Sequence, residues 1–244
     1  MPKFRLRHYI YFIASVLLIL NAPRPICRIT PEGLFYAGFS FIIVIAGLEL
    51  FFLIHRSYQV KAHLDRGDVK NFLEETEREI QYAAGQWKQC YQINKTAGLY
   101  YLGRFEEALD LLDMIEYRKL PKLYRALYIN NRLANLLGAK RIEEAQKLIE
   151  SNETVFQPTV QNRPIYYALQ SKLGVYKYLK GERQTAKYLI EESLKSHQNP
   201  LGQAMAYYYL GCIARDDGQP PIAQEYFQKA KELGKNIYIA DLLC

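Results

Sequence analysis

The side chains that could support catalysis are spread along the chain rather than grouped. The acidic pairs Glu106–Glu107 and Glu143–Glu144 resemble acid–base dyads, but each pair begins a predicted amphipathic helix, where negative charge suits the helix dipole. His55 and His63 are eight positions apart, a poor spacing for one shared metal ion. The chain has no glycine-rich phosphate loop, Gly-x-Ser-x-Gly turn or His-Glu-x-x-His motif. We therefore expect no enzymatic activity, cofactor, metal or small-molecule substrate.

Cysteine content and charge argue against two further classes of protein. The chain of 244 residues has four cysteines and no Cys-x-x-Cys pair, which disfavours a disulfide framework and a cysteine-based metal site. The net charge is +7. Residues 1–54 hold five Lys/Arg and two Glu, or +3, which leaves +4 for the other residues. This remainder is too weakly basic to predict nucleic-acid binding.

One short phrase recurs along the chain and indicates internal repeats. Its last residue is an alanine at positions 108, 145, 186 and 223, so the copies are 37, 41 and 37 residues apart. A spacing in this range is typical of stacked helix pairs. The copies are residues 102–108, 139–145, 180–186 and 217–223, with a weaker copy at residues 66–72.

Each copy predicts a turn between two helices. A tyrosine- and leucine-rich helical stretch precedes it, and an amphipathic stretch follows. Gly103, Gly181 and Gly218 fall where the chain must reverse. The alanines are small where two helices must approach closely. Prolines that end or start helices fall between units, at Pro121, Pro158, Pro164 and Pro200.

These units resemble the tetratricopeptide repeat (TPR) family. The last unit matches the family pattern best, with Leu210, Gly211, Gly218, Ala223, Phe227 and Ala230. The third unit keeps Leu173, Gly174, Gly181 and Ala186, and the resemblance covers residues 60–235. It implies an all-α fold, in which about four to five helix pairs form a right-handed solenoid. It also implies an adaptor that binds a protein or peptide partner, and no catalyst.

The resemblance also implies where a partner would bind. The first helices of such repeats line a concave groove, and their phase assigns one set of residues to it. Amides, phenols and cations in this set suit an extended peptide, whereas most of the 21 tyrosines are expected to pack between helices. The candidate groove residues are Asn94, Tyr101, Asn130, Asn131, Lys172, Tyr178, Tyr208, Tyr209 and Arg215.

The N-terminal part of the chain reads as a membrane anchor. Residues 34–54 are apolar with one charge, Glu49, and as a helix they match the thickness of a bilayer. Residues 9–20 form a shorter apolar run, which predicts either a first transmembrane helix or a cleaved signal peptide. Basic residues flank these runs on the side of the repeats, so we expect the repeats to face the cytoplasm.

These observations together predict a domain order and a function. We expect a membrane anchor at residues 1–56, a linker helix with a degenerate repeat at 57–86, a TPR-like array at 87–235 and a C-terminal cap at 236–244. The predicted protein is a membrane-tethered scaffold that binds a protein partner in its groove. Its compact size and short hairpin indicate a bacterial cell membrane. The alternative is a structural or assembly subunit of a membrane complex that docks through its transmembrane helices. Neither alternative involves nucleic acid.

Overall fold

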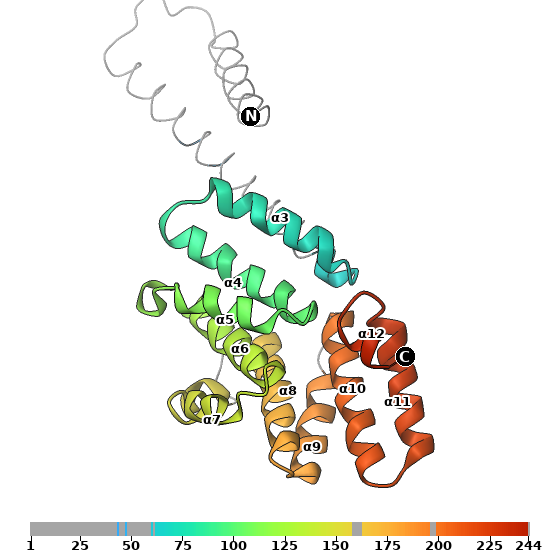
Figure 1. Ribbon diagram of the computed structural model, residues 1–244. Coiled ribbons are helices and arrows are strands. Elements are labelled where there is room, and N and C mark those ends of the chain that lie inside the picture. The colour runs from blue at the N-terminus through green and yellow to red at the C-terminus, as the bar shows by residue number, and fades with distance from the viewer. Residues whose placement is uncertain are drawn as a thin grey trace, which may run out of the picture. The chain divides into compact units, whose positions relative to one another are not determined.

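The computed structural model describes residues 43, 47, 60, 62–157, 163–195 and 199–243 (Figure 1). All regular secondary structure in these residues is helical, as the sequence predicts. Apart from Ile43 and Gly47, both apolar segments of the expected anchor lie outside the described residues. Among the residues that are described, no helix combines the length and the apolar character needed to cross a membrane.

The expected helix pairs are present and follow one another along the chain. From residue 60 onward the helices form one compact unit, in which each helix packs against the next. The pairs α4–α5, α6–α7, α8–α9 and α10–α11 correspond to the four copies of the recurring phrase. The helices are α3 (Val69–Tyr82), α4 (Gly85–Tyr101), α5 (Phe105–Asp113), η1 (Tyr117–Lys119), α6 (Lys122–Gly138), α7 (Ile142–Glu150), η2 (Glu153–Phe156), α8 (Arg163–Leu179), α9 (Arg183–Leu194), α10 (Pro200–Asp216), α11 (Pro220–Leu233) and α12 (Ile239–Leu242).

The reversal inside each pair uses a left-handed backbone conformation. Gly103, Gly181 and Gly218 have φ of 73°, 84° and 72°, which confirms their predicted position at the turns. The weaker copy turns in the same way at Gly67, with φ of 73°. In the α6–α7 pair this place is taken by Lys140, with φ of 60°. A side chain with a Cβ is strained in this region, so Lys140 carries a cost that glycine avoids.

Small residues allow the two helices of each pair to approach closely. Ala108, Ala145 and Ala186 are fully buried, as expected. A Cβ at Gly211 on α10 would lie 2.5 Å from the Phe227 ring on α11, so only glycine fits there without a shift. This contact joins two residues of the unit that matches the TPR pattern best.

The last part of the chain contacts the first of the four pairs (Figure 1). The backbone N–H of Tyr238 donates to the carbonyl of Tyr101, at 2.9 Å. The ring of Tyr238 packs edge-on against Phe105, with 5.2 Å between ring centroids. A Cβ at Gly103 would lie 3.1 Å from that of Tyr238, so the turn between α4 and α5 fits closely around this tyrosine. The side of the helix pairs that faces this contact is therefore interior.

The left-handed turn at Lys140 gives the first testable prediction. We expect Lys140→Gly to raise the free energy of unfolding by about 0.5–1 kcal/mol, because glycine removes the strain but gains freedom in the unfolded chain. Gly181→Ala is the matched control, since a Cβ there meets no atom within 4 Å and only backbone strain changes. We expect this control to lower stability by about 1 kcal/mol. Denaturant unfolding followed by circular dichroism measures both changes, and a loss of stability in Lys140→Gly would contradict the explanation.

Candidate functional site

Four of the nine candidate groove residues are buried, which corrects the expectation that they face an open groove. They are Tyr101, Asn131, Lys172 and Tyr209, and each keeps less than a tenth of its surface exposed. The physical reason is close packing among the helices: Asn131 bonds to α4, and Lys172 lies against Tyr100 of α4. Tyr101 and Tyr209 contact Tyr238 of the C-terminal segment.

Asn131 holds α6 against α4. Its side-chain Nδ2 donates to the carbonyl of Ile93 at 2.9 Å and to Oγ1 of Thr96 at 3.1 Å. The next turn of α6 adds a bond from Nδ2 of Asn135 to the carbonyl of Asn131, at 2.8 Å. Removing one partner of a buried amide hydrogen bond lowers the stability of the folded protein, so Asn131 is a structural residue here.

Tyrosines from α4, α10 and the C-terminal segment meet in the interior. The side chain of Tyr238 hydrogen-bonds those of Tyr100 and Tyr209, and burial raises the pKa of all three phenols well above the ordinary value. Burial likewise raises the pKa of Tyr101 to about 12, although its hydrogen bond with Asn199 acts in the opposite direction. These four tyrosines pack between helices, as expected of most of the 21.

Lys172 on α8 places an amine inside this tyrosine cluster. Only 8% of the side chain is exposed, and it forms no ion pair or hydrogen bond with any described residue. Its Nζ lies 4.8 Å from the centroid of the Tyr100 ring, whose face attracts a cation. Loss of hydration lowers the pKa of Lys172 to about 8, because burial disfavours the charged amine.

Three further candidates are half-buried and bonded to neighbouring side chains. Nδ2 of Asn130 donates to Oδ1 of Asn131 at 3.1 Å, and Asn94 hydrogen-bonds Tyr124. The hydroxyl of Tyr178 donates to Oδ2 of Asp216 at 2.8 Å. These bonds link α4 to α6 and α8 to α10, so the three side chains are already engaged within the fold.

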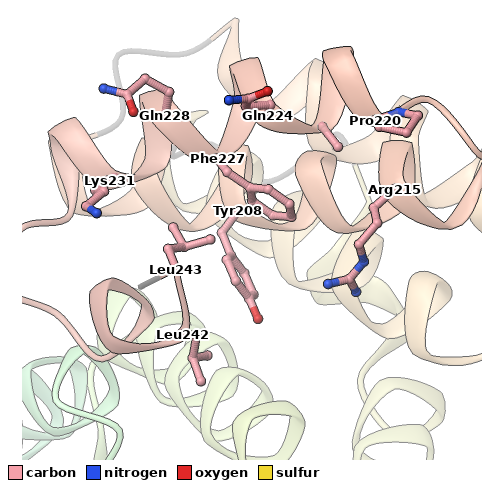
Figure 2. Close-up of a pocket in the computed structure, with 10 residues that line it drawn as sticks. Tyr208, Arg215, Pro220, Gln224, Phe227, Gln228, Lys231, Leu242 and Leu243 are labelled. Carbon is pink, nitrogen blue, oxygen red and sulfur yellow. The ribbon is translucent and has the colours of Figure 1, made fainter.

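The last two candidates, Tyr208 and Arg215, lie together in a pocket between α10, α11 and α12. The pocket has a volume of about 510 Å³. In Figure 2 the Arg215 side chain lies on one side of the Tyr208 ring, and Leu242 and Leu243 lie on the other. The remaining lining residues are Pro220, Ala223, Gln224, Phe227, Gln228 and Lys231.

The pocket combines an apolar floor with positive charge. Tyr208 packs near Phe227, with 6.2 Å between ring centroids, and Leu242 is more than half exposed. Lys231 forms no ion pair with a described residue, and Nε of Arg215 reaches only Oδ1 of Asp216, at 3.4 Å. No acidic residue lines the pocket. Burial raises the pKa of Tyr208 to about 12, so its phenol stays neutral and can donate a hydrogen bond.

This pocket lies beside the contact between α10 and α11. The position four residues after each repeat alanine is Leu112 in α5, Ile149 in α7, Ile190 in α9 and Phe227 in α11. Leu112 and Ile190 are fully buried, whereas Ile149 and Phe227 are partly exposed. Phe227 packs on Gly211 of α10 as Ile190 packs on Gly174 of α8, and the short helix α12 covers only part of the pocket.

Sequence reasoning found Tyr208 and Arg215 but missed the α11 and α12 side of the pocket. No repeat position marks that side: eight residues after the repeat alanine the four copies carry Glu116, Glu153, Leu194 and Lys231.

Neither similarity to known proteins nor a cluster of metal ligands assigns a further role to these residues. No protein-family model matches the chain, and no curated protein is significantly similar to it. Within the described ranges, no three His, Cys, Asp or Glu residues come close enough together to hold a metal ion.

The buried amine of Lys172 gives a prediction about pH. Between about pH 8 and pH 10 the unfolded chain binds the lysine proton and the folded chain does not, so this residue makes stability rise with pH. Lys172→Met keeps the volume and removes the charge. We expect the variant to be more stable than the wild type at pH 7 by about 1–3 kcal/mol, and the difference to shrink as pH rises from 8 to 10.

The measurement is denaturant unfolding of both full-length chains in detergent at a series of pH values. Taking the difference between the two chains cancels the buried tyrosines, which titrate in both. A difference that stays constant from pH 7 to pH 10 would show that the amine keeps its ordinary pKa.

Proposed function

We propose that this protein is a membrane-tethered, TPR-like scaffold that recruits a protein partner. The partner binds at the open end of the array, in the pocket between α10, α11 and α12, and not along a concave groove. The observation that carries the proposal is the lining of this pocket, where the partly exposed Phe227 and the exposed Leu242 lie beside two exposed cations, Arg215 and Lys231. An apolar face of this type is normally covered.

An acidic amphipathic helix is the occupant that suits this face. Helices cover the equivalent faces of α5 and α9, so the curvature of α11 fits a helix. Phe227, Leu242 and Leu243 offer apolar contact to one side of such a helix. Arg215 and Lys231 supply positive charge with no acidic residue in the lining, which favours carboxylates on the partner.

The tether supports recruitment by raising the local concentration of the partner. Residues 34–54 supply an apolar segment of the length that a bilayer requires, and they precede the compact unit by only a few residues. A tethered scaffold holds its partner near the membrane even when their intrinsic affinity is modest. This role requires no chemistry beyond binding.

The double variant Arg215→Glu/Lys231→Glu tests the pocket. Both side chains are exposed, so we expect stability to change by no more than about 0.5 kcal/mol. Binding of a helical, acidic partner crosslinked from native membranes should weaken by roughly tenfold or more, because the new charges repel it. Reversing the acidic residues of the partner helix to lysine should restore binding. The control Lys180→Glu/Lys187→Glu makes the same charge change at exposed positions outside the pocket and should bind normally.

Two outcomes would contradict this assignment. Full binding by the Arg215→Glu/Lys231→Glu variant would place the partner elsewhere on the molecule. If replacement of residues 1–54 by an unrelated transmembrane segment abolishes binding, the anchor itself docks the partner, and the protein is a subunit of a membrane complex.

A further inference from the structure

Large aromatic and apolar side chains project from one edge of the helical unit. Tyr82 at the end of α3 is 59% exposed, Trp87 at the start of α4 is 53% exposed, and Leu123 at the start of α6 is 46% exposed. The side chain of Gln86 joins the start of α4 to the segment before α6, because its Nε2 donates to the carbonyl of Lys119 at 2.5 Å. We call these three side chains and the turns that carry them the aromatic edge.

Basic residues surround the aromatic edge and most lack an acidic partner. Lys119 pairs with Glu116 at 2.7 Å. The other four are exposed and form no ion pair with any residue that the structure describes, so five bases and one acid leave this edge at +4. These four residues are Lys88, Arg118, Lys122 and Arg125.

This combination matches the boundary of an anionic bilayer. Tyrosine and tryptophan favour the headgroup region, because their rings are apolar while the phenol O–H and indole N–H can bond to water or lipid. Lysine and arginine beside them attract lipid phosphates, at about 1 kcal/mol per residue near an anionic surface. The inference needs both features, because exposed aromatic rings alone or cations alone would not indicate the boundary of an anionic bilayer.

The covalent connection of the chain places the unit within reach of such a surface. The apolar stretch ends at residue 54, six residues before Val60, and an extended chain of this length spans at most about 20 Å. The helical residues 62–65 reverse at Gly67 into α3, so they run antiparallel to α3. A tether of this length keeps the unit close to the bilayer.

We propose that the aromatic edge binds the surface of an anionic membrane. Tyr82 and Trp87 enter the headgroup region, and the four unpaired basic residues contact lipid phosphates. This contact fixes the orientation of the helical unit on the bilayer. The inference rests on the tether proposed above and is independent of the pocket between α10, α11 and α12.

Trp87 is the single tryptophan of the chain and reports on this contact directly. The full-length protein is reconstituted into vesicles of phosphatidylcholine alone or with phosphatidylglycerol, and Trp87 emission and its quenching by acrylamide are measured. In the anionic vesicles we expect a blue shift and a severalfold lower quenching constant. Lys88→Glu/Lys122→Glu should abolish both effects, whereas Lys180→Glu/Lys187→Glu, with the same charge change, should leave them intact.

Vesicle flotation separates failure of the tether from failure of the lipid contact. A chain that floats with neither kind of vesicle lacks the tether, and this result would overturn both the tether and the lipid contact. A chain that floats with both, while Trp87 stays equally open to acrylamide, retains the tether and overturns only the lipid contact. Protection of Trp87 in native membranes but in neither vesicle would assign the aromatic edge to an acidic protein and would also overturn the proposal.

Discussion

The hydrogen bond from Tyr238 to Tyr101 joins residues that are 137 positions apart. It brings the segment after α11 to α4 and α5, the first of the four helix pairs. Around it, the Tyr238 ring contacts Phe105 and Tyr100, and the turn at Gly103 leaves room for it. This contact buries tyrosines of α4 and α10 that an open array of repeats would present to a partner, and it leaves the pocket beside α11 available.

The local features of the fold could be predicted from the sequence because each depends on neighbouring residues. The turn glycines, the buried alanines and the helix pairs follow from a phrase of seven residues and its spacing. The same reasoning explains Pro200, which begins α10 beside the capping side chain of Asn199. Lys140 departs from the glycine pattern, yet the backbone keeps the same turn, since the helices on both sides of it determine where the chain reverses.

The burial of the candidate site could not be predicted in this way. Asn131, Lys172 and Tyr209 occupy positions that the repeat pattern assigns to a groove, and nothing near them in the sequence indicates a cover. Asn131 and Lys172 are covered by contacts with α4, and Tyr209 is covered by Tyr238, which comes after α11 and follows no repeat pattern. Tyr208 and Arg215 were found because they lie on α10, where the pattern is clearest, but their partners on α11 and α12 depend on where the array stops.

The contact between the two ends has a consequence for synthesis of the protein. A simple stack of repeats can fold pair by pair as it leaves the ribosome, because each pair needs only its neighbour. Here the inner side of α4 stays uncovered until Tyr238 emerges, and at typical translation rates the intervening residues take on the order of 10 s to be made. During that interval the nascent chain exposes the tyrosines and the amine that the finished molecule buries. In the folded protein, the segment that carries Tyr238 cannot detach from α4 without reopening this interior.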